Sequence, residues 1–244
     1  MFVTPKNLTV KNPVKHIDCT TCQNLALSSF CSLKQSELEQ LNEHKLTHRV
    51  KKNQVIFGEG DTAKGMHCVH QGKVKLYKTT ADGSMQILRI AGAGELVGYR
   101  GLLGDGKYIA TGVALEESIV CFIPKERIFN LINTNVKFTM EIISKFAQDL
   151  SLAESKSVNF IQKSSRARLA ETLLLLEKSF GTTADHYLNI ILTREDIASI
   201  SGMVTETVVR VLREWEDDHI IALNKKQISI INHAKLVVLA ELED

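Results

Sequence analysis

Three cysteines near the start of the chain have the type and spacing of metal ligands. Cys19 and Cys22 are separated by two residues, and Cys31 follows after the segment QNLALSSF. A C-x2-C pair places two thiolates within reach of one metal centre. If the chain folds back, the third cysteine can join them, and Cys121 in the apolar segment SIVCFIP is the best candidate for a fourth ligand. The fifth cysteine, Cys68, lies in the alternating segment MHCVHQG and has the pattern of a small buried side chain.

Spacing alone leaves four interpretations of these cysteines open. The four candidate ligands could hold a [4Fe–4S] cluster, which takes four thiolates. Zinc could instead take the three N-terminal cysteines together with His16. Cys19 and Cys22 could form a thiol–disulfide pair, although the spacer Thr20-Thr21 and the lack of a surrounding βαβ pattern disfavour this. Finally, the cysteines could bind nothing.

A second chemical pattern, in the segment from Leu192 to Leu223, is typical of a DNA-reading unit. Thr193 and Asp196 have the spacing of a capping box at the start of a short helix, and Gly202 suits the turn after it. The next helix has an apolar stripe at i, i+3, i+4 and i+7, which is expected to be buried. The stripe consists of Val208, Val211, Leu212 and Trp215.

The opposite side of this second helix suits the major groove of DNA, which admits one helix and exposes base edges to its N-terminal residues. Arg210 can pair with a guanine, Glu206 can accept a hydrogen bond from a cytosine, and Val209 can contact a thymine methyl. The alternative is an ordinary helical hairpin with a solvated Glu/Arg face. The helix residues predicted to contact DNA are Thr193, Thr205, Glu206, Val209, Arg210 and Arg213.

Two short strands with a basic turn are predicted after this helix. Residues 220–223 and 227–231 flank Asn224-Lys225-Lys226, which indicates a β-hairpin and therefore a winged helix. Lys225 and Lys226 can touch DNA phosphates. From residue 161 onward the chain has 10 Lys/Arg and 13 Asp/Glu, so phosphate affinity must come from local placement rather than from net charge.

The segment TREDIASISGMVTETVVRVL resembles the helix-turn-helix of the CRP/FNR family of bacterial transcription regulators. Glu206 and Arg210 match the Glu and Arg of the family's recognition helix. Val204 stands where the family has a Ser or Thr cap, so Thr205 could cap instead and shift the start of the helix by one residue, and Val209 replaces a Gly or Ser. The resemblance implies a DNA-binding regulator rather than an enzyme. The partners that it implies are a near-palindromic DNA duplex, a second copy of the chain and RNA polymerase. No association with a membrane is expected.

The cysteines resemble those of the FNR branch of that family, whose members hold an oxygen-labile [4Fe–4S] cluster. Cys19 and Cys22 match the branch, and Cys121 falls at the corresponding place before Phe-Ile-Pro. Cys31 departs from it, because the family's gap to the third cysteine is shorter. The resemblance implies that a cluster at Cys19, Cys22, Cys31 and Cys121 senses oxygen or redox state. A zinc or thiol switch, or a small ligand in the sensor domain, is the alternative.

The residues from Val55 to Pro124 are predicted to form the frame around Cys121. Short alternating stretches separated by Gly and Asp turns predict an antiparallel β-roll. The pattern resembles a cyclic-nucleotide-binding barrel at Gly72 and at Gly94-Glu95-Leu96. In the family's nucleotide-binding members an Arg-Ser or Arg-Thr pair holds the cyclic phosphate. Ile109-Ala110 stands about there instead, so no cyclic nucleotide is expected.

A long helix is predicted to join the two parts and to pair with its copy. From Val136, apolar residues follow alternating spacings of three and four over more than three heptads, which is typical of a parallel helix pair. Dimerisation would place two recognition helices one DNA turn apart. The predicted dimer residues are Ile143, Phe146, Leu150, Ala153, Ser157 and Phe160.

Composition and length agree with this architecture. The 244 residues carry a net charge of +2, with 44% hydrophobic and 24% charged residues, which is typical of a soluble globular protein. No run of about 18 apolar residues and no secretory signal are present, so a cytoplasmic location with reduced thiols is expected. The predicted fold is α+β. Residues 1–34 form an arm and cysteine segment, 35–125 the β-roll, 126–162 the dimerisation helix, and 163–244 a winged helix-turn-helix.

Overall fold

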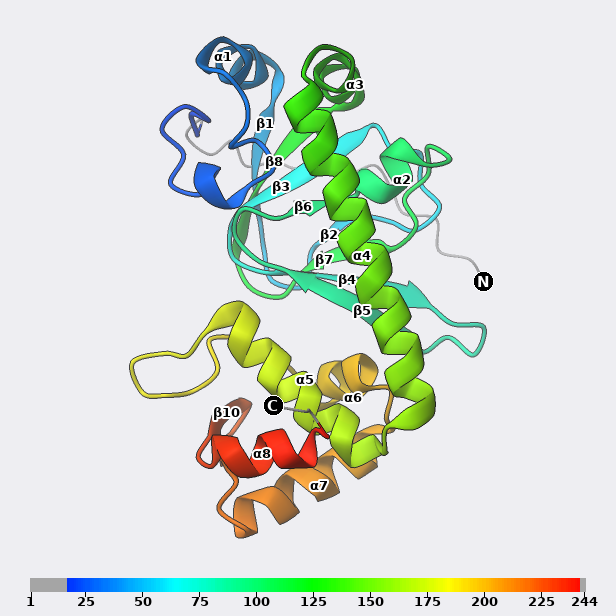
Figure 1. Ribbon diagram of the computed structural model, residues 1–244, viewed down its shortest axis with the longest axis vertical. Coiled ribbons are helices and arrows are strands. Elements are labelled where there is room, and N and C mark those ends of the chain that lie inside the picture. Colours follow the sequence, from blue (N-terminus) through cyan, green and yellow to red (C-terminus); the bar gives the residue numbers. More distant parts are fainter. Residues whose placement is uncertain (1–16, 242–244) are drawn as a thin grey trace. The chain divides into compact units, whose positions relative to one another are not determined.

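The computed structural model describes residues 17–241 (Figure 1). They form two compact units, which are described separately. Of the described residues, the first unit contains 17–79 together with Leu88–Leu150, and the second contains Thr80–Ile87 together with 151–241. His16, considered above as a zinc ligand, and the arm before it lie outside the described residues.

The predicted β-roll is confirmed. Within residues 17–241 it consists of two four-stranded sheets, with the strand orders β1-β8-β3-β6 and β2-β7-β4-β5. The neighbours in the first sheet pair in the antiparallel sense, as do β2 with β7 and β7 with β4 in the second. The strands are β1 (Leu46–Val50), β2 (Val55–Phe57), β3 (Gly65–Gln71), β4 (Val74–Thr79), β5 (Met85–Ala91), β6 (Leu96–Val97), β7 (Thr111–Ala114) and β8 (Ser118–Pro124). β1 was not predicted, because LTHRV has no clear alternation of apolar and polar residues.

Apolar side chains from both sheets fill the roll. Val69 of β3, Val120 of β8 and Val74 of β4 are at most 1% exposed. The corner between β3 and β4 requires Gly72, whose φ is +87°, and a Cβ there would lie 2.2 Å from the Ser118 hydroxyl oxygen. The sequence alternation therefore translates directly into an inner and an outer face of each sheet.

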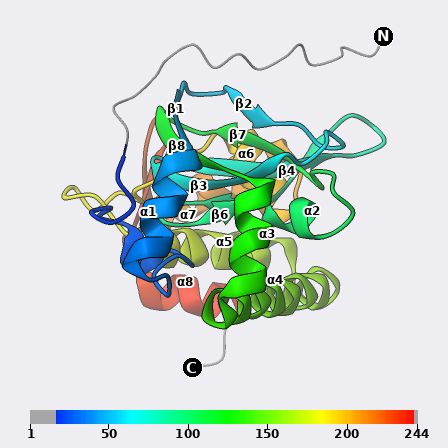
Figure 2. The same ribbon diagram turned by 90° about the horizontal axis from the view of Figure 1, so that it is seen from above.

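Short helices cover one side of the roll. A 3-10 turn (Leu25–Leu27) precedes α1 (Gln35–His44), α2 (Tyr99–Leu103) follows β6, and α3 (Lys125–Thr134) follows β8. Helices α1 and α3 lie side by side and both contact β8 (Figure 2). The 3-10 turn, α1 and α2 were not predicted from the sequence, whereas most of α3 falls within the stretch predicted as the dimerisation helix. Within residues 17–241 no helix is long and apolar enough to cross a bilayer.

The long helix α4 (Val136–Gln162) begins directly after Asn135, which separates it from α3. The Asn135 side-chain oxygen accepts a hydrogen bond from the Phe138 amide at 3.0 Å, and its amide group donates to the Glu37 carboxylate at 2.8 and 3.0 Å. Residues 126–162, expected to form the dimerisation helix, therefore contain most of α3 and the whole of α4. Phe138 and Ile142, on one side of α4, are 0% and 3% exposed.

The second unit contains the predicted winged helix-turn-helix, which is confirmed. Its elements are α5 (Ser165–Phe180), α6 (Arg194–Ser201), α7 (Thr205–Asp217), the hairpin β9 (Ile221–Asn224) with β10 (Gln227–Ile230), and α8 (His233–Leu239). Ser164 caps α5, since its hydroxyl accepts from the Ala167 amide at 3.1 Å. Leu169, Leu173 and Leu176 of α5 are buried, as their spacing predicted.

Candidate DNA-binding surface and cysteine site

Helix α6 is fixed at both ends by local interactions. The Thr193 hydroxyl accepts from the Asp196 amide at 3.0 Å, and the Thr193 amide donates to the Asp196 carboxylate at 3.1 Å, so the predicted capping box is confirmed. Gly202 ends the helix with a φ of +64°, and a Cβ there would lie 2.2 Å from the Phe160 ring. These contacts set the turn that leads into α7.

Replacing Thr193 with alanine is expected to lower the free energy of unfolding of the second unit by about 1 kcal/mol, because the α6 N-terminus loses its side-chain acceptor. Thr193→Ser keeps the hydroxyl and should remain close to the unchanged protein. Chemical denaturation followed by circular dichroism measures both. If the alanine and serine variants were equally stable, Thr193 would not act as a cap.

Helix α7 begins at Thr205, after the extended N-cap residue Val204, which makes no side-chain cap bond. The expectation that Thr205 caps the helix is therefore wrong. The Val204 carbonyl already accepts from the Thr207 and Val208 amides at 3.1 and 3.2 Å, so the helical bonds start one residue earlier than a Thr205 cap would allow.

The two faces of α7 separate as the spacing predicted. The residues of the apolar stripe are at most 1% exposed. On the opposite side, one shallow surface is lined by Thr205, Glu206, Val209, Arg210 and Arg213, together with Glu214 and Asp217. The structure thus gathers five of the predicted DNA contacts on one helix face. Thr193 lies apart from this surface, at the start of α6, where its hydroxyl is engaged in the capping box.

Arg210 forms an ion pair on its own helix. Its guanidinium lies 2.7 Å from the Glu214 carboxylate, one turn further on, and Arg166 of α5 pairs with the same carboxylate. The Arg210 side chain is 61% exposed. An exposed pair of this kind contributes little to stability, so it does not prevent the Arg210 guanidinium from exchanging this carboxylate for another partner.

The wing carries its two lysines at the tip. Gln227 pairs with Asn224 across the hairpin, so Lys225 and Lys226 form the connecting turn, and both are exposed. The Lys225 carbonyl accepts from the Arg194 guanidinium at 3.3 Å, which ties the tip to the first turn of α6. The predicted basic hairpin is confirmed as a structural element.

The predicted dimer residues occupy different environments on α4. Ile143, Leu150 and Phe160 are 52%, 61% and 58% exposed, and Ala153 and Ser157 are also exposed. Phe146 is only half-buried, with its ring edge-on to Tyr99 at a centroid distance of 5.3 Å. Exposed large apolar side chains along one helix are typical of a face that packs on a partner.

Three of the four predicted cysteine ligands line one pocket. Cys19, Cys22 and Cys121 share it with His70 and the buried Lys45. Cys31 is exposed and lies outside the pocket lining. Within residues 17–241, no three His, Cys, Asp or Glu side chains stand where they would hold a single metal ion.

The turn that carries Cys19 and Cys22 is held by polar contacts. The Cys19 amide donates to the Asn42 side-chain oxygen at 2.7 Å, and the Asn42 amide group donates to Asp18 at 2.5 Å. The Thr20 amide and hydroxyl also donate to Asp18, each at 2.8 Å. These hydrogen bonds lower the pKa of Asp18, the Thr20 hydroxyl contributing most. They anchor the C-x2-C turn to α1.

Lys45 brings a positive charge to the thiols. Its ammonium group donates to the Cys19 sulfur at 2.9 Å and also to the Ile17 carbonyl. Burial raises the pKa of Cys19, and Lys45 opposes this effect. Burial also raises the pKa of Cys121. No periodic signal marks Lys45, because it stands between α1 and strand β1, which was not predicted.

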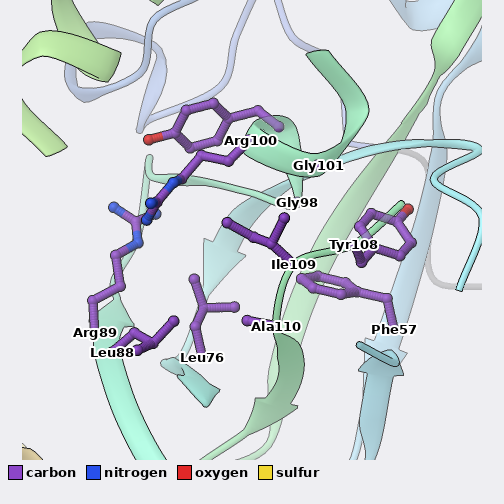
Figure 3. A pocket seen from close by; sticks show the side chains of 11 residues that line it. Phe57, Leu76, Leu88, Arg89, Gly98, Arg100, Gly101, Tyr108, Ile109 and Ala110 are labelled. Carbon is purple, nitrogen blue, oxygen red and sulfur yellow. The ribbon is translucent and has the colours of Figure 1, made fainter. Parts of the chain in front are cut away.

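A separate pocket in the β-roll lies beside the segment where a cyclic phosphate would be held in the nucleotide-binding barrels (Figure 3). Ile109 and Ala110 line it with their apolar side chains. Two arginines, Arg89 and Arg100, lie at its other end, and each is 3.9 Å from the Asp149 carboxylate of α4. The charged groups of this pocket are therefore already paired within the protein.

Two domain families match the chain. Residues 47–135 match the cyclic nucleotide-binding domain, and residues 167–239 match the Crp-like helix-turn-helix domain. The fumarate and nitrate reduction regulatory protein of Vibrio cholerae serotype O1 is 30% identical over 227 residues, which cover 90% of each chain.

Solved structures share the fold at lower identity. FixK2 from Bradyrhizobium japonicum has a TM-score of 0.74 at 22% identity, covering 82% of this chain and 99% of its own. A CRP/FNR-family transcriptional regulator from Thermus thermophilus has a TM-score of 0.68 at 21% identity, covering 81% and 100%. With the sequence relationship to the Vibrio protein and the β-roll and winged helix in the same chain, this protein belongs to the CRP/FNR family of DNA-binding transcription regulators.

Proposed function

We propose that this regulator binds a near-palindromic DNA site as a dimer and that a cysteine-ligated [4Fe–4S] cluster controls this binding in response to oxygen or redox state. The observation that carries the DNA-reading part is the single exposed face of α7, with Glu206, Arg210 and Arg213 on it. The observation that carries the sensing part is the pocket that gathers Cys19 and Cys22 with Cys121, although more than 90 residues separate them in the sequence.

DNA reading follows from the exposed face of α7. The helix fits the major groove, where Arg210 can donate two hydrogen bonds to a guanine and Glu206 can accept one from a cytosine. Arg213 lies three residues after Arg210 on the same face, and the exposed lysines of the wing can contact phosphates. A half-site that contains a G·C pair is the expected target.

Dimerisation supports this assignment because two half-sites must be engaged together. The exposed apolar side chains Ile143, Leu150 and Phe160 of α4 would be covered by the same helix of a second copy. The symmetric pair would carry two recognition helices, each facing one half of the operator. RNA polymerase is the further partner expected of a regulator that acts at promoters.

The residues of the pocket fit a cluster in their chemistry. Thiolates are the ligands that iron–sulfur clusters take, and the Lys45 ammonium group would offset part of their negative charge. When bound, such a cluster supplies an oxidant-sensitive link between the cysteine segment and β8. A relative named for fumarate and nitrate reduction supports this proposal at 30% identity.

The cysteine segment is coupled to α4 through an aromatic contact. Phe30 is buried and stacks on Phe138 in the first turn of α4, with ring centroids 5.7 Å apart. Cys19 and Cys22 lie at one end of the cysteine segment, and Phe30 anchors its other end. A change in their ligation therefore acts on the start of the helix that carries the dimer residues. Even a small bias between DNA-competent and incompetent states changes occupancy when the competent state is partly populated.

Replacing Arg210 with alanine tests the DNA-reading role. Binding to a duplex selected from a random library should weaken by about 1–3 kcal/mol, with loss of preference at one base pair, because a bidentate base contact is lost. Lys225→Ala is the matched control, since loss of a phosphate contact should weaken binding to all duplexes alike. Equal weakening on all sequences by Arg210→Ala would contradict base reading by Arg210.

A further inference from the structure

We propose that Cys68, rather than Cys31, completes the cluster site with Cys19, Cys22 and Cys121. The inference rests on the proposed cluster and names its ligand set. Cys68 lines the same pocket as the other three cysteines, whereas Cys31 does not. The four ligands would thus come from the C-x2-C turn and from the two central strands of one sheet, β3 and β8.

Strand register places Cys68 beside Cys121. In the antiparallel pair of β3 and β8, Cys68 lies directly opposite Cys121. Directly opposite residues point to the same face of a sheet, with Cβ atoms about 4.5–5.5 Å apart. The two thiols therefore form a pair on a rigid part of the fold, and this pair does not depend on the position of any loop.

The C-x2-C turn approaches the same face of the sheet. The Cys22 sulfur lies 3.5 Å from Nδ1 of His70, which follows Cys68 by two residues on β3 and lines the same pocket. The Asn24 side chain donates to the His70 carbonyl at 2.6 Å and fixes the segment against β3. Cys22 is therefore held next to the strand that carries Cys68.

The Cys68 thiol has only weak partners within the protein. It donates to the Gly94 carbonyl at 3.8 Å and to the Val69 carbonyl at 4.0 Å. The four thiols line one pocket, and the protein contacts of Cys68 are weak enough to be exchanged for a metal bond.

Cys31 is turned away from this group by its neighbours. Phe30 stacks on Phe138, and Leu33 is buried in the same core. The Cys31 amide donates to the Ser28 carbonyl at 3.1 Å in a turn that leaves its side chain exposed. To bring Cys31 into the pocket, this turn and its apolar anchors would have to be displaced. The long gap between Cys22 and Cys31 is explained if Cys31 is not a ligand.

Matched alanine variants of the cysteines test the ligand set. Cys68→Ala, Cys31→Ala and Cys121→Ala would be reconstituted without oxygen from ferrous iron and sulfide, and their iron, sulfide and visible absorption compared with those of the unchanged protein. We expect Cys31→Ala to retain the full content, and Cys68→Ala and Cys121→Ala to lose most of it. Full retention by Cys68→Ala, or loss by Cys31→Ala, would overturn the proposal.

A measurement on the unchanged protein guards against misfolding of the variants. In the reconstituted protein, N-ethylmaleimide should modify Cys31 as fast as in the metal-free protein, with no loss of iron, as followed by mass spectrometry. Protection of Cys31 by the cluster would overturn the ligand set. If the unchanged protein took up no iron and sulfide at all, the proposed sensing function would fail as well, whereas uptake that is unaffected by Cys68→Ala would remove only the present inference.

Discussion

Replacing Trp215 with alanine is expected to lower the free energy of unfolding of the second unit by about 3–5 kcal/mol, the usual cost of removing a large aromatic side chain from a core. Trp215 is 1% exposed and is the last residue of the buried stripe of α7. The Trp215 carbonyl also accepts from the Ile220 amide at 2.8 Å, where the chain leaves α7 for the wing. The loss should therefore affect both α7 and the wing.

Urea denaturation followed by circular dichroism measures this loss, because the variant no longer contains a tryptophan for fluorescence. Val238→Ala is the matched control in the same unit, since Val238 is 74% exposed and its truncation should change stability by less than about 0.5 kcal/mol. Similar unfolding midpoints for the two variants would show that the α7 stripe does not form the core described above.

Replacing Lys45 with methionine is expected to weaken retention of the metal centre. Lys45 is 4% exposed and donates to the Cys19 sulfur at 2.9 Å. A hydrogen bond to a charged group contributes about 1.5–3 kcal/mol, which corresponds to about 10–150-fold in affinity. Methionine fills similar space without the charge, so the loss should come from electrostatics rather than from a cavity.

The chelator concentration that removes half of the iron under anaerobic conditions measures this effect. Lys51→Met removes a positive charge from an exposed position and should leave this chelator concentration unchanged. In the metal-free protein, Lys45→Met should remove a weaker interaction, because a neutral thiol accepts a hydrogen bond from the Lys45 ammonium group more weakly than a thiolate does. Equal chelator sensitivity of Lys45→Met and Lys51→Met would contradict a role for Lys45 at the metal centre.

Local signals predicted the DNA-binding half of this protein well. The Thr193–Asp196 spacing, the turn at Gly202 and the apolar period of α7 each involve residues within about two helical turns, so the sequence determines them directly. The N-cap of α7 is Val204 and not Thr205, one residue before the position considered from the sequence. The carbonyl of Val204 starts the helical hydrogen bonds without help from a side chain.

Long-range pairing determines the sensor half, and there the sequence was less informative. Strand β1 carries no alternating pattern and forms because β8 offers it an edge, with Thr47 opposite Cys121. Asn135 breaks the helical stretch through a contact with Glu37, a residue of another helix. Spacing favoured Cys31 as a ligand because it follows the C-x2-C pair, whereas only the register of β3 against β8 places Cys68 beside Cys121.

The most direct test is to follow metal content and DNA affinity in one anaerobically purified sample, before and after air is admitted. We expect about four iron and four sulfide per chain with visible absorbance. Affinity for a selected duplex should fall in step with the loss of colour. Affinity that stays constant while the iron is lost, or a colourless protein that contains zinc, would contradict control of DNA binding by an iron–sulfur cluster.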